Sequence, residues 1–366
     1  TPRQTTQAST PAADDLTEPH RLFAWSSDFY TSMQSAFDTE VKAVLGRRRD
    51  DAVDSDAVCG GGEGSIVPAS LDEIVARFDS TGGLIPDIGL LEPLEAADAE
   101  SGQAAGHALA AAYLSKLEGD VVKDELRLQA GNMIGHMAGS LPPWVAPVGR
   151  LVNFLHCNNV KVETGKTSTY VEREVMAAMH KTFYGFDDDF YRTHSMDDGV
   201  CLGHPCSGGT VANLEALWTA RNSAHPGCDR AGVSSESEGV VLTSELGHYS
   251  LSKAIDVLGL GTSSVVAVPT KAFKMDVAAL AAKLDELKRA KRKVVAIVAV
   301  AGTTEAGSFD PIRQIATLAK AHGAWLHVDA AWAGGLIFSP STAALFDGVE
   351  LADSITVDAH KSLFAP

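Results

Sequence analysis

The second half of the chain alternates short apolar runs with amphipathic helical patterns, and this alternation restricts the fold more than any other feature. Helical periodicity recurs over 277–287, with Asp276 as the expected N-cap, and again after Asp310-Pro311, with Asp310 at the N-cap. Short Val- and Ile-rich runs suit strands that are covered on both faces. The pattern predicts an α/β domain with a mainly parallel sheet and flanking helices. The expected strands lie at 239–245, 264–270, 293–302, 324–330 and 354–360.

The first part of the chain has a different composition. Residues 1–20 are rich in Ser, Thr, Pro and Ala without periodicity, which predicts a disordered tail. Residues 45–65 are polar and Gly-rich, and with no preceding strand and no following Lys-Ser/Thr they indicate a linker and not a phosphate loop. We therefore expect an N-terminal helical segment over 21–130, interrupted by this linker, and a large α/β domain over 131–366.

Charge and hydropathy exclude several classes of function. Acidic residues outnumber basic ones by 47 to 30, and the formal net charge of −17 argues against nucleic acid or an anionic membrane as a partner. No apolar run approaches the roughly 20 residues of a membrane span, and the N-terminus lacks the hydrophobic block of a secretory signal. The five cysteines lack the spacing of a zinc site, so we expect reduced thiols, no metal and a cytoplasmic protein.

Polar residues gather where the expected strands end, which is the edge at which open α/β sheets bind ligands. Thr303 follows the run at 293–302, Asp329 ends the run AWLHVDA, and Lys361 follows the last run. His248 begins a helix after 239–245. Together with the Ser-Gly-Gly-Thr turn at 207–210, they supply an anion site, an aromatic base, a carboxylate and an amine, as an electron-sink cofactor with a phosphate group requires.

Each of these signals also has an ordinary structural interpretation. The turn at 207–210 precedes a helix whose expected apolar face carries Val211, Leu214 and Trp218; its free amides favour a phosphate, but Gly-Gly-Thr is also a common helix start. His248 can stack on a ring or simply cap its helix.

The two charged residues are equally ambiguous when each is taken alone. Asp329 can pair with a protonated pyridine nitrogen or cap the next turn. Lys361, if desolvated, attacks carbonyl carbons readily, or it forms an ion pair with Asp358 or Asp329. The order and spacing of all four signals, considered together, favour the cofactor site.

Seven sequence blocks, taken in order, indicate a protein family that has such a cofactor site. From about residue 130 to its end, the chain resembles the group II pyridoxal 5′-phosphate (PLP)-dependent decarboxylases, which have the fold type I architecture. The first block and the DAHK form of the last are similar to the bacterial aspartate- or tyrosine-decarboxylase branch. The blocks are GHMAGSLPPW (135–144), NNVKVETGKTSTYVEREV (158–175), SGGTVANLEALWTARN (207–222), HYSLSKAIDVLGLG (248–261), AGTTEAGSFDPI (301–312), HVDAAWAGG (327–335) and ADSITVDAHK (352–361).

The resemblance implies a role for each matching residue. Lys361 would form the Schiff base with PLP, and Asp329 would pair with the pyridinium nitrogen. Ala331 and His248 would contact opposite faces of the ring, with His248 also able to protonate the substrate carbon, and Thr303 would lie near the ring. The residues implied to hold the phosphate are Gly208, Gly209, Thr210, Ser354 and His360.

The same resemblance implies decarboxylation of an L-amino acid to an amine and CO₂, in a homodimer with its site at the subunit interface. It implies a seven-stranded main sheet, and because the sequence stops soon after Lys361, we expect an incomplete large domain without the small C-terminal domain. Two alternatives stay open: another fold type I reaction (carbon–carbon lyase, aminotransferase or oxidative decarboxylase), or a truncated, non-catalytic subunit. Asp358 stands where many relatives have asparagine, and its role is open.

Overall fold

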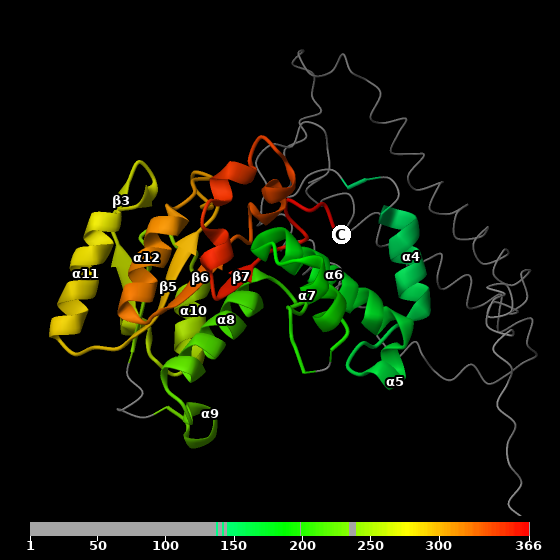
Figure 1. The fold of residues 1–366 in the computed structure, drawn as a ribbon, viewed down its shortest axis with the longest axis horizontal. Coiled ribbons are helices and arrows are strands. Elements are labelled where there is room, and N and C mark those ends of the chain that lie inside the picture. The colour runs from blue at the N-terminus through cyan, green and yellow to red at the C-terminus, as the bar shows by residue number, and fades with distance from the viewer. Residues whose placement is uncertain (1–136, 138–140, 143–144, 198, 234–238, 366) are drawn as a thin grey trace, which may run out of the picture. The chain divides into compact units, whose positions relative to one another are not determined.

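A parallel sheet organises the part of the chain that the structure describes (Figure 1). The computed structural model describes residues 137, 141–142, 145–197, 199–233 and 239–365. The expected tail over 1–20, the linker over 45–65 and the helical segment over 21–130 lie outside the described residues. Among the described helices, none is long and apolar enough to cross a membrane.

All five strands of the main sheet run parallel, in the order β2-β1-β5-β6-β7. Each falls within a run that the sequence indicated, and the mainly parallel sheet is confirmed. The described residues contribute five of the seven strands that the resemblance implies. Two short antiparallel strands form a separate ribbon: β3 (Thr270–Lys271) and β4 (Lys274–Met275). The main strands are β1 (Val240–Ser244), β2 (Val265–Val268), β5 (Val294–Val300), β6 (Trp325–Asp329) and β7 (Ser354–Thr356).

Helices follow the strands in the alternating order typical of a parallel sheet. Short 3₁₀ segments complete the connections around β6 and β7: η7 (Gly334–Phe338), η8 (Ala343–Phe346) and η9 (Val349–Leu351), with η6 (Thr262–Ser264) before β2. The α-helices are α4 (Val145–Leu155), α5 (Val162–Gly165), α6 (Thr167–Tyr184), α7 (Asp188–His194), α8 (Gly209–Ala224), α9 (Cys228–Ala231), α10 (Ser250–Val257), α11 (Val277–Arg289) and α12 (Ile312–His322).

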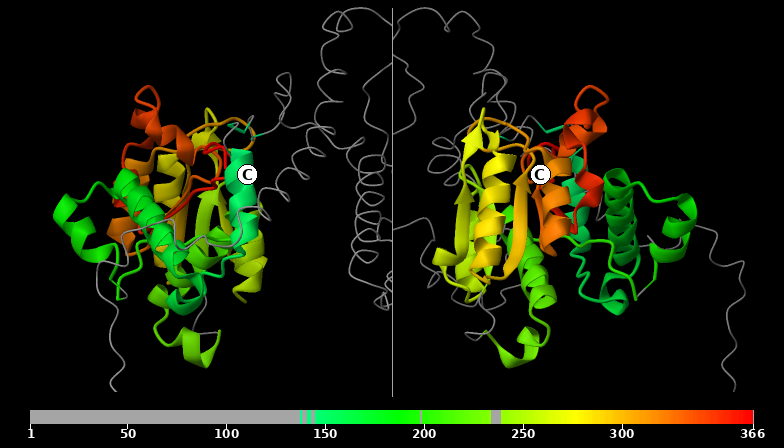
Figure 2. Two further views of the ribbon diagram at one scale, coloured as in Figure 1. Left: turned by 90° about the vertical axis from the view of Figure 1, so that its right-hand side faces the viewer. Right: turned by 60° about the vertical axis from the view of Figure 1, so that its left-hand side comes forward.

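The sheet is buried on both faces, each against its own pair of helices. Helices α11 and α12 lie together on one face (Figures 1 and 2), where Leu284 and Ile315 pack with Leu242 and other apolar side chains in one core cluster. Helices α8 and α10 cover the other face, where Leu217 and Ile255 belong to a second cluster. Every residue of β1 and β5 is buried, which explains why neither strand alternates between apolar and polar residues and why β5 is a continuous apolar run.

The predicted N-cap of α11 is confirmed, whereas that of α12 is wrong. Asp276 accepts hydrogen bonds from the amides of Ala278 (3.0 Å) and Ala279 (3.4 Å). The N-cap of α12 is Pro311, and Asp310 is turned inward instead. Its buried carboxylate accepts from the amides of Met275 (2.7 Å) and Val300 (2.8 Å). Asp310 therefore joins the β3–β4 ribbon to the end of β5, a long-range role that local spacing does not indicate.

The two backbone bonds of Asp310 give a first prediction. The substitution Asp310→Asn replaces one acceptor oxygen by an amide donor, so one buried N–H loses its partner, and the free energy of unfolding should fall by about 1–3 kcal/mol. Burial raises the pKa of the Asp310 carboxyl, partly offset by its two backbone hydrogen bonds. Above its unfolded pKa, ionisation of this group therefore costs stability as pH rises, and the variant should lack this fall.

Chemical denaturation of both proteins across pH checks this prediction. Asp276→Asn is the matched control, because asparagine caps a helix about as well as aspartate and the change should stay within about 0.5 kcal/mol. Equal losses in the two variants would contradict the structural role given to Asp310.

Candidate active site

Helix α8 begins at a glycine turn on the edge where the parallel strands end. Gly208, its N-cap, has φ +151°, a conformation that favours glycine. A Cβ on Gly209 would lie 3.3 Å from the Cβ of Ala331, so the turn lies against the segment that follows β6. The amides of Val211 and Ala212 both donate to the Gly208 carbonyl. Those of Gly209 and Thr210 have no intrahelical acceptor and, at the positive end of the helix dipole, are suited to an anion.

The inward face of α8 differs from the face that the sequence indicated. Trp218 is 49% exposed, and Val211 and Leu214 are only half-buried. The fully buried positions are instead Asn213, Leu217 and Ala220. Leu214 still packs against the second core cluster, but Trp218 does not face the core, and the buried face includes a polar residue that apolar periodicity did not indicate.

Asp329, the last residue of β6, is buried, and both of its carboxylate oxygens are engaged. Oδ2 accepts a hydrogen bond from Asn213 Nδ2 (2.9 Å), and Oδ1 accepts from the Ala331 amide (3.1 Å). The second bond is the turn-capping interaction that the ordinary interpretation of Asp329 anticipated. The first fixes the carboxylate against α8, and it was not anticipated.

His248 lies after β1, one residue before the N-cap of α10. Its Nδ1 accepts a hydrogen bond from the Ser250 amide (3.2 Å) and lies 2.8 Å from Ser250 Oγ. Asn213 Nδ2 donates to the same Ser250 Oγ (3.0 Å). One carboxamide therefore connects the His248 segment with the Asp329 carboxylate.

Lys361 lies in the turn that follows β7, with its Nζ 3.8 Å from Asp358 Oδ2. Both side chains are largely shielded from solvent. The Asp358 carboxylate also lies near the glycine turn, 3.9 Å from the position of a Cβ on Gly209. The Asp358 amide donates to the Ala331 carbonyl (3.2 Å), which attaches this segment to the end of β6. Lys361, Asp358, Gly209 and Ala331 thus meet at one edge of the sheet.

Three other predicted site residues make hydrogen bonds within the protein. Thr303 follows β5 and is buried, but its Oγ1 accepts from the Ser308 amide (3.2 Å) and closes its own turn. His360 is exposed, and its amide donates to Asp358 Oδ1 (3.0 Å). Ser354 starts β7 opposite His327, and so lies before the strand end and not at it. Its hydroxyl is engaged inside the sheet, and we do not retain Ser354 as a phosphate ligand.

The sequence interpretation missed Asn213, Ser250 and His327, which form the buried polar layer behind the site. His327 Nε2 lies 3.0 Å from Asn213 Oδ1, and its Nδ1 lies 2.9 Å from Ser354 Oγ. Burial lowers the pKa of His327 to about 4, although the nearby Asp329 charge opposes this shift, so the ring is neutral at pH 7. The available signal was a lone polar residue within an apolar pattern, at 213 on α8 and at 327 on β6.

A second cluster of polar side chains lies just before the glycine turn. The Glu215 carboxylate pairs with His204 Nε2 (2.8 Å) and accepts from Cys206 Sγ (3.3 Å). These three residues also have the geometry of a possible metal site. Burial and a hydrogen bond to Glu215 raise the pKa of the Cys206 thiol to about 11. The four described cysteines are unpaired.

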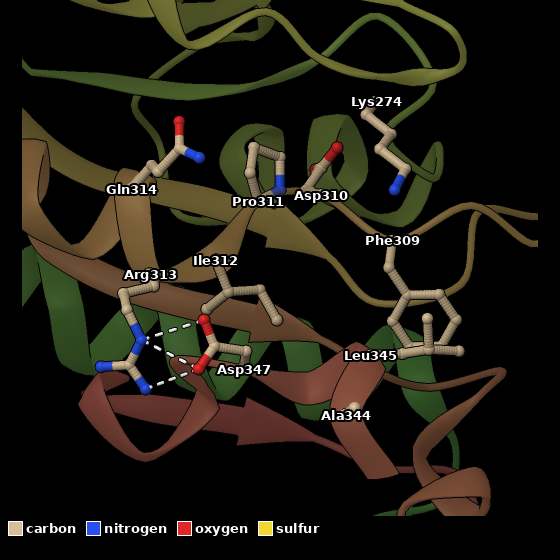
Figure 3. Close-up of a pocket in the computed structure, with 10 residues that line it drawn as sticks. All are labelled: Lys274, Phe309, Asp310, Pro311, Ile312, Arg313, Gln314, Ala344, Leu345 and Asp347. Atoms are coloured by element: carbon tan, nitrogen blue, oxygen red, sulfur yellow. Dashed lines mark hydrogen bonds and ion pairs between the residues drawn. The ribbon is translucent and has the colours of Figure 1, made fainter. Parts of the chain in front are cut away.

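A hollow near the start of α12 lies apart from all of these residues (Figure 3). Arg313 and Asp347 face each other across its rim in a two-pronged ion pair, with contacts of 2.8–3.0 Å. The guanidinium lowers the pKa of the Asp347 carboxyl through hydrogen bonding. This pair attaches α12 to the segment between η8 and η9, and none of the predicted site residues lines the hollow.

Comparison with known proteins decides the family. A family model described as "Pyridoxal-dependent decarboxylase conserved domain" matches residues 142–366. The chain belongs to this family. It is 41% identical to the aspartate 1-decarboxylase of Aliivibrio fischeri over 261 residues, which cover 67% of this chain and 47% of the relative. It is 42% identical to an L-aspartate decarboxylase of Metarhizium robertsii over 165 residues, covering 45% of this chain and 33% of the relative.

Solved structures agree on the fold. The crystal structure of mouse CSAD in its apo form superposes with a TM-score of 0.66 at 24% identity, covering 91% of this chain and 63% of that chain. This similarity shows the fold type I architecture of the large domain. The chain spans about half or less of the length of the curated relatives described above.

The donor set at the sheet edge suits the cofactor in the family's description. The Lys361 amine can react with an aldehyde, and the buried Asp329 carboxylate can pair with a protonated ring nitrogen. The amides of Gly209 and Thr210 can bind a phosphate. Around Gly208, a Cβ would meet no atom within 4 Å, so the turn leaves space in front of the helix N-terminus. These residues therefore fit pyridoxal 5′-phosphate.

Burial of neutral His327 gives a second prediction. The pKa of His327 in the folded chain lies below the ordinary 6.5. Below pH 6.5, therefore, this ring takes up a proton more readily in the unfolded chain than in the folded one. This contribution to stability is complete above pH 6.5 and is lost as pH falls below that value. His327→Gln should flatten the dependence of unfolding free energy on pH in that range, while His322→Gln, at the end of α12, should retain it. An unchanged slope in the first variant would contradict this account of His327.

Proposed function

We propose that this chain carries the cofactor-binding site of a pyridoxal 5′-phosphate-dependent decarboxylase, which converts an L-amino acid into the corresponding amine and CO₂. The observation that supports the proposal is that Lys361 and Asp358 lie beside the Gly208–Gly209 turn, while Asp329 is hydrogen-bonded to the helix that this turn begins. Membership of the pyridoxal-dependent decarboxylase family supports both the cofactor and the type of reaction.

Each residue at the edge has a distinct task in this proposal. The bound cofactor would supply a ring that accepts the electron pair released when a bond to the amino-acid α-carbon breaks. Lys361 would hold the aldehyde carbon through Nζ. Asp329 would keep a proton on the ring nitrogen, because an acceptor-only carboxylate stabilises the charged form. The amides of Gly209 and Thr210 would hold the phosphate, and Ala331 would contact one face of the ring.

The remaining predicted residues have supporting tasks. His248 would contact the opposite face of the ring, and its connection to Asn213 through Ser250 supports a fixed position. Thr303 would shape the wall at the end of β5, with its hydroxyl engaged in its own turn. His360 is exposed next to Asp358 and would reach the phosphate from outside. Before the cofactor binds, Asp358 would pair with Lys361 and hold its side chain beside the glycine turn.

L-Aspartate is the substrate that we propose to test first. Two relatives named as aspartate decarboxylases, one bacterial and one fungal, support this choice.

We also propose a homodimer. Helix α4 exposes Val148, Leu151, Val152 and Leu155, an apolar face that a second copy would cover. A molar mass in solution equal to that of a single 38.4 kDa chain would contradict the dimer.

Release of CO₂ tests the proposed reaction. The chain, loaded with PLP, should release CO₂ from one member of a panel of aspartate, glutamate, 2,4-diaminobutyrate, tyrosine and the branched-chain amino acids. Lys361→Ala should reduce release to the level of PLP alone, because it removes the amine that holds the aldehyde. Lys320→Ala, an exposed lysine on α12, should leave the rate unchanged.

Product analysis separates the alternatives. Transfer of the amino group to a keto acid, cleavage of a side-chain carbon–carbon bond, or oxygen-dependent release of an aldehyde would replace decarboxylation by another fold type I reaction. A chain that binds no PLP would contradict the proposal altogether and support a non-catalytic subunit.

A further inference from the structure

A continuous series of side-chain hydrogen bonds lies behind the site, from Trp325 at the start of β6 to His248. We call it the buried relay. Asn213, Ser250 and His327 at its centre are at most 1% exposed. Its five contacts measure 2.8–3.0 Å, and its members in order are Trp325, Ser354, His327, Asn213, Ser250 and His248.

One direction of hydrogen bonding satisfies every member of the first half of the relay. Trp325 Nε1 is a donor and never an acceptor, so Ser354 Oγ accepts from it (2.8 Å). The Ser354 hydroxyl donates its single proton to His327 Nδ1 (2.9 Å) in the arrangement that satisfies both groups. Because the buried His327 ring is neutral, its proton must lie on Nε2. His327 therefore donates to Asn213 Oδ1 (3.0 Å).

This direction fixes the Asn213 carboxamide and everything beyond it. With Oδ1 facing His327, the two protons on Nδ2 go to Asp329 Oδ2 (2.9 Å) and Ser250 Oγ (3.0 Å). Since Ser250 Oγ accepts that bond, its own proton goes to His248 Nδ1 (2.8 Å). His248 Nδ1 is then an acceptor, and the ring proton lies on Nε2.

The far end of the relay requires the same direction independently. The ionised Asp329 carboxylate only accepts, so it must face the nitrogen of Asn213 and not its oxygen. The Ser250 amide only donates, and it points at His248 Nδ1 (3.2 Å). Reversing a member at the buried centre would set donor against donor or acceptor against acceptor, which is costly in a low-dielectric interior.

We propose that Asn213 and Ser250 are positioning residues that hold His248 in the tautomer with its proton on Nε2 and, through the same carboxamide, fix the orientation of Asp329. This inference rests on the proposed function, because only that function gives His248 and Asp329 a role toward a bound cofactor. It assigns to His248 a defined hydrogen-bond donor, Nε2–H, on the side of the ring that is free of the relay. It also gives Asp329 and His248 a common support.

The tautomers of His248 and His327 are directly measurable by ¹⁵N NMR of the whole chain labelled at histidine, because protonated and unprotonated ring nitrogens resonate in different ranges. The chain has 12 histidines, and the signals are assigned by their loss in His248→Gln and His327→Gln. We expect both rings to carry their proton on Nε2 at neutral pH. A proton on Nδ1 of His248 would overturn the proposal.

Two variants test whether the relay causes this state. Ser250→Ala removes the hydroxyl donor and leaves the backbone donor, so the ratio of His248 tautomers should shift by about fivefold to tenfold towards Nδ1–H, the worth of one hydrogen bond. Trp325→Phe removes the donor that orients Ser354 and should shift His327 in the same sense. Trp218→Phe, which removes the same N–H from an exposed position on α8, should change neither ring.

The outcomes separate this inference from the proposed function. An unchanged His248 ratio in folded Ser250→Ala would overturn the relay, whatever the chain does with amino acids. The expected shift in a chain that releases no CO₂ would support the relay and count against the decarboxylase. In a chain that does release CO₂, Asn213→Leu should lower kcat more than it raises KM, because it misplaces groups that act on the bound substrate.

Discussion

The parallel register of β5, β6 and β7 is the constraint on which the site depends. Val300 is paired with Asp329, and Asp329 with Thr356, so the segments after these strands leave the sheet at one level. Two apolar layers of helices hold this register by burying both faces of the sheet. Lys361 and Asp329 consequently lie at the same edge of the sheet, although they are 32 positions apart in the chain. The glycine turn of α8 completes the edge against Ala331.

Behind that edge, polar groups replace apolar packing between α8 and β6. The Asn213 carboxamide joins the helix to Asp329, His327 and Ser250, and each bond uses a different hydrogen or lone pair. Such a layer costs stability unless every member is satisfied, because unpaired buried polar groups are expensive. We infer that this layer fixes the orientation of the Asp329 carboxylate and the tautomer of the His248 ring, the two groups that would contact the bound cofactor.

The sequence predicted the strands, the edge and most of the residues that meet there, because apolar runs and strand ends are local signals. It placed Asp310 at a helix N-cap and Trp218 in the core. Asp310 instead accepts from distant backbone amides, and Trp218 is half exposed because α8 turns Asn213 and Leu217 inward. Asn213 and His327 were missed for the same reason. A buried polar side chain finds its partner 114 residues away, as His327 does in Asn213, and local spacing carries no trace of that pairing.

The most direct test of the account is to locate the lysine that reacts with PLP. The chain would be incubated with the cofactor, reduced with borohydride to fix any carbon–nitrogen bond, and digested for mass mapping. The account predicts that stoichiometric modification falls on Lys361, whose amine Asp358 holds beside the glycine turn. Modification spread over exposed lysines, with Lys361 not enriched, would contradict the claim that this sheet edge is the cofactor site.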